Sequence, residues 1–278
     1  MQAIDGAEEL NLRIAALDTA NISDYDTTAF HSLHQKTVAG DAEKFISVLR
    51  HITSKGRHDE TPVTSSSEAD AVIGTCRLIS RLGTLQPVLV SGGITGLPQY
   101  WISTIKPPRL PPREQAPSQD HFISPAMVPP ASSANPFGMG FYTSTGFGAS
   151  QGMWRIYLDF DQDSSLFRKP WHVWRLGMGA ANIYEVTNAT DWEELALRYP
   201  MFSGGLIYPD WKSIAEDWDA VHITLRAIAA IQGIRLRASR GLIAPSYWDV
   251  ESTFWLHWVF SSLAHVETVE GSPESPLS

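Results

Sequence analysis

The sequence predicts an α+β protein, and three observations support this class. Helical periodicity dominates the first part of the chain, aromatic strand-like segments follow, and short helices separate these strands without a regular β-α-β rhythm. The 278 residues can hold one large domain with an extension. We therefore expect an N-terminal helical region over 1–84, a mixed domain over 85–265 and a mobile acidic tail over 266–278.

The N-terminal region contains three helical patterns. They cover about 7–17, 26–51 and 67–83, each with apolar residues at helical spacing. His31 and His34 are three residues apart, a spacing that can bind a metal on a helix, but no third ligand lies nearby. We predict no metal site.

Strands and short helices are mixed in the rest of the chain. The predicted strands are 86–90, 140–144, 154–160, 182–187, 220–224 and 252–260, and the predicted helices are about 190–199, 210–217 and 225–232. Residues 106–136 are rich in proline and serine and are too long for an ordinary connection. This stretch is either a functional loop or partly disordered.

Composition excludes several classes of protein. A net charge of −9 argues against a general nucleic-acid binder, and we expect the small cluster of Arg235, Arg237 and Arg240 to be solvated surface. Cys76 is the only cysteine, so no intrachain disulfide forms. The N-terminus does not resemble a signal peptide, and no apolar stretch is long enough for a membrane span. We expect a soluble, cytoplasmic protein that does not contact a membrane.

A run of hydroxyl side chains makes the first candidate site. The segment 137–146 places Thr143, Ser144 and Thr145 directly after Phe141 and Tyr142 on a glycine-spaced strand. An aromatic side chain there can stack on a flat ring, and the hydroxyls can bind a ribose or a catalytic acid. The alternative is an edge strand with a glycine-rich hairpin and no such function.

Glu251 is the second candidate. It lies among aromatic and apolar residues, and strand alternation places it on one face with Asp249 and Thr253. A buried acid is costly without a partner and is often functional, whereas a half-exposed strand would leave it in water. Glu185 also lies in a strand-like segment, and we expect His222 to be a hydrogen-bonded core histidine.

Together these segments resemble motifs of the ADP-ribosyltransferase superfamily. The strand 137–145 resembles the motif strand that builds part of the nicotinamide pocket, and Glu251 matches the catalytic glutamate, with Asp249 in the place of an upstream acid. Residues 88–93 are the candidate first strand, where the family has Arg or His before Gly92. This chain has Ser91 instead, so either Ser91 takes a reduced role or the anchoring residue lies elsewhere, at Arg155.

The resemblance implies an ADP-ribosyltransferase-like mixed split β-sheet and NAD⁺ as substrate. Glu251 would bind the ribose 2′-hydroxyl, Tyr142 would stack on nicotinamide, and Ser144 would hold Glu251 by a hydrogen bond. Cofactor-binding roles would fall to a further set of residues: Ser91, Gly92, Phe141, Thr143, Thr145, Arg155 and Asp249. The stretch 106–136 would act as a lid or target-recognition loop.

The implied partners are those of a toxin or effector delivered into a target cell. The resemblance implies an acceptor that is a protein or a nucleic acid, together with an inhibitory partner protein. Water as acceptor would make the protein an NAD glycohydrolase instead.

The tryptophans suggest a different function. Of the ten tryptophans, all but Trp101 lie between Trp154 and Trp258. A non-catalytic module would expose Trp171, Trp174 and Trp211 as a platform for a glycan or a protein. Alternatively, the tryptophans fill a core and need no function.

Overall fold

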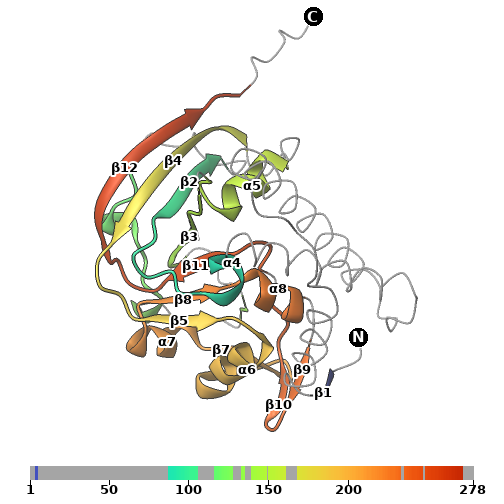
Figure 1. Cartoon of the computed structure of the whole chain (residues 1–278). Coiled ribbons are helices and arrows are strands. Elements are labelled where there is room, and N and C mark those ends of the chain that lie inside the picture. Colours follow the sequence, from blue (N-terminus) through green and yellow to red (C-terminus); the bar gives the residue numbers. More distant parts are fainter. Residues whose placement is uncertain are drawn as a thin grey trace, which may run out of the picture.

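The computed structural model describes residues 4–5, 87–105, 116–127, 133–134, 139–148, 150–160, 168–232, 235–246 and 248–271. Within these residues the fold is α+β with mixed sheets, as predicted. Figure 1 shows a large curved sheet, a separate smaller sheet and helices beside them. Of the predicted N-terminal region, only Ile4–Asp5 is described, as β1, so its three predicted helices lie outside the described residues.

The larger sheet has seven strands and brings the two candidate segments together. Its order is β12 (Phe260–Val269), β4 (Arg168–Met178), β2 (Gln99–Ile105), β3 (Phe141–Thr145), β11 (Ser252–Trp255), β8 (Ala220–Ile223) and β5 (Ile183–Val186). All neighbours are antiparallel except β5 and β8. Strands β3 and β11 are adjacent at the centre, with Thr253 opposite Thr143 and Phe254 opposite Tyr142.

The smaller sheet has five strands. Its order is β1, β9 (Leu236–Ala238), β10 (Gly241–Ile243), β7 (Leu206–Pro209) and β6 (Pro200–Ser203). Gly204 and Gly205 join β6 to β7 with φ angles of 57° and 76°. Two consecutive positive φ angles suit a tight hairpin turn and favour glycine at both positions.

Three predicted helices are confirmed, and a polar side chain caps each. They are α6 (Ala189–Arg198), α7 (Trp211–Asp217) and α8 (Leu225–Ile231). The side chains of Asn188, Asp210 and Thr224 accept hydrogen bonds from the first free backbone N–H groups of these helices. Such caps satisfy donors that have no partner inside the helix.

Two predicted strands are wrong because they are helices. The segment predicted as strand 154–160 is α5 (Met153–Phe160), whose buried Met153, Ile156 and Tyr157 follow helical spacing. The segment predicted as the first motif strand is the short helix α4 (Val88–Ser91). Pro87 precedes it with helical backbone angles, and its carbonyl accepts from the N–H groups of Val90 and Ser91.

The C-terminal strand prediction was partly wrong. The predicted strand 252–260 ends at Trp255, and the chain then turns before it starts β12. Strand β12 continues through Val269 and pairs with β4, so residues 266–269 belong to the sheet and not to the tail. Residues 272–278 of the predicted tail lie outside the described residues.

The described parts of the proline-rich stretch pack on the body of the protein. Residues 116–127 contain two 3₁₀ turns, Gln119–His121 and Pro125–Met127. The hydroxyl of Ser124 donates to the carbonyl of Leu256 over 2.8 Å. The indole N–H groups of Trp211 and Trp248 donate to the carbonyls of Ser133 and Ala134 over 2.7 and 3.1 Å. The other residues of 106–136 are not described, apart from 133–134.

Tryptophans fill the core, which is the third of the alternatives drawn from the sequence. Five of them are almost completely buried: Trp171, Trp192, Trp211, Trp248 and Trp255. The binding platform predicted at Trp171, Trp174 and Trp211 is therefore wrong, because Trp171 is 1% exposed and Trp211 is 3% exposed.

Candidate functional site

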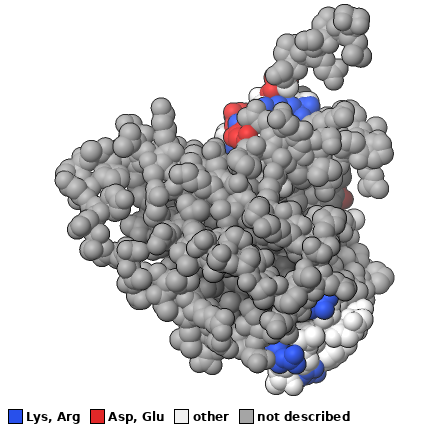
Figure 2. Space-filling model, turned by 90° about the vertical axis from the view of Figure 1, so that its right-hand side faces the viewer, with Lys and Arg blue, Asp and Glu red and all other residues white. Residues whose placement is uncertain are grey.

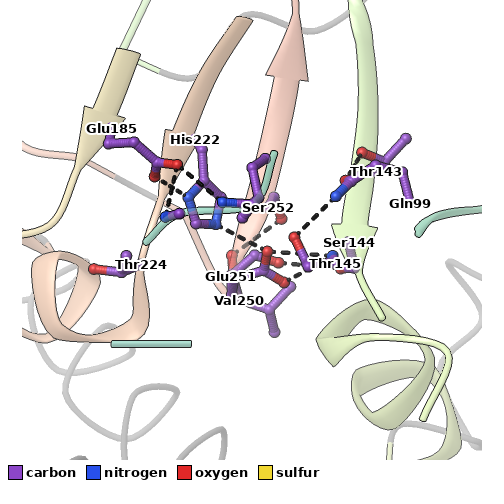
Figure 3. A network of polar contacts seen from close by, with 12 residues as sticks. Gln99, Thr143, Ser144, Thr145, Glu185, His222, Thr224, Val250, Glu251 and Ser252 are labelled. Atoms are coloured by element: carbon purple, nitrogen blue, oxygen red, sulfur yellow. Dashed lines mark hydrogen bonds and ion pairs between the residues drawn. The ribbon is translucent and has the colours of Figure 1, made fainter. Parts of the chain in front are cut away.

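A row of polar side chains crosses the seven-stranded sheet inside the protein (Figure 3). We call it the polar row, and it consists of Gln99, Thr143, Thr145, Glu185, His222 and Glu251. All of its members are buried except Glu185, whose side chain is 26% exposed. Buried polar groups need partners, so the contacts along this row decide what it can do.

His222 lies between two carboxylates. It sits on β8 opposite Glu185 of β5, and its Nδ1 faces Glu185 Oε2 at hydrogen-bond distance. Its Nε2 lies 3.0 Å from Oε1 of Glu251, which precedes β11. His222 and Glu251 are both fully buried. Three neighbouring strand segments thus supply an acid, a base and a second acid in contact.

The β3 strand holds Glu251 from the other side. The backbone N–H of Thr145 lies 3.2 Å from each oxygen of the Glu251 carboxylate. The hydroxyl of Ser144 donates to the backbone carbonyl of Glu251 over 3.1 Å and accepts from the N–H of Trp154 over 2.9 Å. Ser144 does contact Glu251, as expected, but at its main chain and not at its carboxylate.

Glu185 is fixed by a glycine turn. Its Oε1 accepts from the N–H groups of Gly93 and Ile94 at 3.0 and 3.3 Å. Gly92 has a φ angle of 76°, and a Cβ atom there would lie 2.7 Å from Glu185 Oε2. Only glycine fits at this close approach. The predicted site residue Gly92 thus adjoins the polar row through Glu185.

The charges of the row shift its pKa values. Burial lowers the pKa of His222, but the hydrogen bonds and charges of Glu185 and Glu251 outweigh it and raise that pKa to about 9. Burial raises the pKa of Glu185, but the bond and charge of His222 and the N–H groups of Ile94 and Gly93 bring it below its ordinary value. At neutral pH, His222 is therefore a cation beside an ionised Glu185.

The remaining members of the row bridge β2 and β3. The hydroxyl of Thr143 donates to the Gln99 amide oxygen over 2.6 Å and accepts from the indole of Trp255 over 2.8 Å. The Gln99 amide nitrogen donates to the hydroxyl of Thr145 over 3.1 Å. The hydroxyls of Thr143 and Thr145, which the resemblance assigned to cofactor binding, are thus both bonded to Gln99.

One buried hydroxyl next to the row has no partner. Thr253 lies on β11 between His222 of β8 and Thr143 of β3, and it is completely buried. Its hydroxyl makes no hydrogen bond among the described residues. An unpaired buried hydroxyl costs stability.

Tyr142 lies on the opposite face of the sheet from Glu251. Its ring stacks on Phe254 with centroids 4.7 Å apart and meets Trp248 edge-on at 5.8 Å. Burial raises its pKa well above the ordinary value. The resemblance implied that Tyr142 and Glu251 face the same NAD⁺. This is wrong, because the register pairs Tyr142 with Phe254, while His222, the partner of Glu251, pairs with Thr253.

The other predicted site residues lie away from the triad of Glu185, His222 and Glu251. Arg155 is on α5, where it contacts Asp159 and Glu267. The hydroxyl of Ser91 donates to the Pro87 carbonyl over 2.7 Å at the end of α4. These contacts do not support either residue as the anchor that the resemblance requires.

Phe141 and Asp249 also stand apart from the triad. The Phe141 ring packs against Trp101 with centroids 5.4 Å apart. Asp249 is exposed, two residues before the buried Glu251.

The described charged residues at the surface include one cluster that the sequence singled out. Arg235, Arg237 and Arg240 are exposed near the β9–β10 hairpin, as predicted for solvated surface. Figure 2 shows described Lys and Arg side chains at the lower end of this view and both charge signs at the upper end. No group of His, Cys, Asp and Glu among the described residues is placed to bind a metal. In the same part of the chain, every helix is too short or too polar to cross a bilayer.

Comparison with protein-family models, with curated proteins and with solved structures finds no match.

Proposed function

We propose that this protein is an ADP-ribosyltransferase that cleaves the nicotinamide–ribose bond of NAD⁺ and passes ADP-ribose to a macromolecular acceptor. The supporting observation is the position of Glu251, buried where β11 begins and bound to the backbone of the hydroxyl-bearing strand β3. The resemblance implied this juxtaposition of two segments that are 106 residues apart at the Thr145–Glu251 contact. On this proposal, the seven-stranded sheet is the ADP-ribosyltransferase-like core.

The chemistry needs a fixed carboxylate. The bond between the ribose C1′ and the nicotinamide nitrogen breaks, and its electron pair leaves with nicotinamide, which becomes neutral. The sugar carries positive charge until the acceptor forms a bond to C1′ and releases a proton. A carboxylate that accepts from the ribose 2′-hydroxyl stabilises this charge, and it acts best when it is held in place beforehand.

The two carboxylate oxygens of Glu251 differ in how free they are to accept a hydrogen bond from the ribose. Oε1 contacts both His222 Nε2 and the Thr145 N–H, whereas Oε2 contacts the Thr145 N–H alone. A carboxylate oxygen can accept more than one hydrogen bond. We assign Oε2 to the ribose hydroxyl.

Access to Glu251 requires motion, because its side chain is completely buried. Glu185 is the one partly exposed member of the polar row, and the exposed Gly93 donates a hydrogen bond to it. We assign the entry of NAD⁺ to the surface at Glu185 and Gly93. Tyr142 has no place in this mechanism, since it packs within the aromatic core.

Nicotinamide release tests the proposal. We expect the wild type to consume NAD⁺ and release nicotinamide, and Glu251→Gln to lower the rate by about 10²- to 10³-fold. Glu216→Gln, on the exposed surface of α7, is the matched control and should keep the wild-type rate. Circular dichroism checks that each variant is folded. Equal rates for wild type and Glu251→Gln would reject the assignment.

The products separate transfer from hydrolysis. Labelled NAD⁺ that leaves its ADP-ribose on a protein or nucleic acid indicates a transferase. Release of all label as free ADP-ribose, with no acceptor modified, indicates an NAD glycohydrolase that uses the same Glu251 chemistry with water.

A further inference from the structure

The triad contains two residues that the proposed reaction does not yet use. Glu185 contacts the exposed Gly93 and is itself partly exposed, whereas His222 is completely buried. His222 therefore cannot meet NAD⁺ as a base in this conformation. Any role that it has in the reaction acts through Glu251.

The protonation state of His222 follows from its contacts. Both ring nitrogens face carboxylate oxygens, Glu185 Oε2 at Nδ1 and Glu251 Oε1 at Nε2. A neutral imidazole has only one N–H, so it would leave one nitrogen lone pair against a carboxylate. The imidazolium donates to both. The geometry alone thus favours a cation at this position.

The contacts form a series that starts at the backbone and ends at the Glu251 carboxylate. Two backbone N–H groups, from Gly93 and Ile94, fix Glu185. Glu185 fixes the ring of His222, and His222 fixes Oε1 of Glu251. Each side chain in this series of contacts has fewer accessible rotamers because the side chain or backbone before it in the series is fixed.

We propose that Glu185 and His222 are positioning residues that hold the Glu251 carboxylate for its contact with the ribose. This inference rests on the proposed function and adds two residues to it. Carboxylate–histidine pairs orient the ligands of metal sites in a similar way, and loss of the outer partner there lowers activity by about 10- to 100-fold.

A purely structural triad is the alternative, and kinetics separates the two. We expect His222→Gln and Glu185→Gln each to lower kcat for nicotinamide release by about 10- to 100-fold, with a smaller change in the KM for NAD⁺. His265→Gln, an exposed histidine on β12, is the matched control and should match the wild type. Glu185→Gln keeps the shape of a partly exposed side chain, so it serves where His222→Gln does not fold.

The pH profile of kcat, measured per folded molecule, adds a readout that a purely structural role would not move. The titratable groups in contact with His222 are Glu185 from β5 and Glu251 before β11. The wild-type kcat should fall as the pH rises through about 9, where His222 loses its proton. The same fall should be absent from His222→Gln.

The ¹⁵N NMR spectrum tests the protonation state of the His222 ring without any substrate. In ¹⁵N-labelled protein at pH 7, both ring nitrogens of His222 should show the shifts of an imidazolium, with the signal assigned by its loss in His222→Gln. A neutral ring at pH 7 would overturn the inference.

The outcomes separate this inference from the proposed function. Full kcat and an unchanged pH profile in folded His222→Gln and Glu185→Gln, with Glu251→Gln inactive, would overturn the positioning role alone. A wild type that releases no nicotinamide would overturn the proposed function and this role with it.

Discussion

The two faces of the sheet at β3 and β11 carry different side chains: one face is aromatic and the other is polar. On the aromatic face, Tyr142 stacks on Phe254 beside Trp248 and Trp211. On the opposite face, the polar row joins Glu251 to buried polar and charged groups. The aromatic face is a packed core, whereas the polar row carries the groups of the proposed reaction. A shift of one residue in register would exchange the two.

The largest expected effect lies on the aromatic face. Phe254 is fully buried, so Phe254→Ala should lower the free energy of unfolding by about 3–5 kcal/mol through lost contacts and a cavity. Phe202, which is 59% exposed, provides the control, and Phe202→Ala should change stability by less than about 1 kcal/mol. Urea denaturation measures both. Similar small losses in both variants would mean that the aromatic face is not a packed core.

The polar row should make stability depend on pH. The pKa of His222 rises from 6.5 to about 9 on folding, so its contribution is complete below about pH 6.5 and is lost as the pH rises through about 9. This contribution is roughly 3 kcal/mol. The lowered pKa of Glu185 acts at the acid end, where stability is lost as the pH falls through its folded value. Unfolding curves from pH 6 to 10 should show the alkaline loss in wild type and not in His222→Gln.

Substitution of Gly92, in the turn beside Glu185, should lower stability more than substitution of the nearby Gly96. Gly92→Ala forces a Cβ atom to within 2.7 Å of Glu185 Oε2, at a backbone conformation of φ 76° and ψ −153° that other residues avoid. We expect a loss of about 1–3 kcal/mol. Gly96 has φ 80° but no atom within 4 Å of its Cβ position, so Gly96→Ala should cost less. Thermal unfolding compares the two, and a greater loss at Gly96 would contradict the placement of Glu185.

The smallest effect is expected at Arg155, which the resemblance had offered as an anchor for NAD⁺. Its partners Asp159 and Glu267 are each 40% exposed, and such pairs contribute at most about 1 kcal/mol. Arg155→Ala should therefore leave both stability and nicotinamide release close to wild type. A large loss of activity with stability preserved would return Arg155 to the site.

Local signals predicted part of this structure. Asn188, Asp210 and Thr224 cap helices whose positions the sequence indicated. Strands β3, β5 and β8 also followed from their residues. The segment of α5 was mistaken for a strand because its aromatic and apolar residues are contiguous, and helical spacing of the buried ones decides the structure.

The site depended on information that is not local. The resemblance placed Glu251 beside the strand 137–145, and the structure brings Glu251 into contact with Thr145 of that strand. It did not reveal that Glu185 and His222 complete a triad, because the parallel pairing of β5 and β8 alone puts them opposite each other. The wrong orientation of Tyr142 has the same origin, since side-chain faces are known only after the register is fixed.

The central claim is that the chemistry lies on the face of Glu251 and His222 and not on that of Tyr142. Nicotinamide release by Glu251→Gln and Tyr142→Phe, each measured per folded molecule, tests it directly. We predict a loss of about 10²- to 10³-fold for Glu251→Gln and a rate close to wild type for Tyr142→Phe. A rate that collapses in Tyr142→Phe and survives in Glu251→Gln would contradict this account.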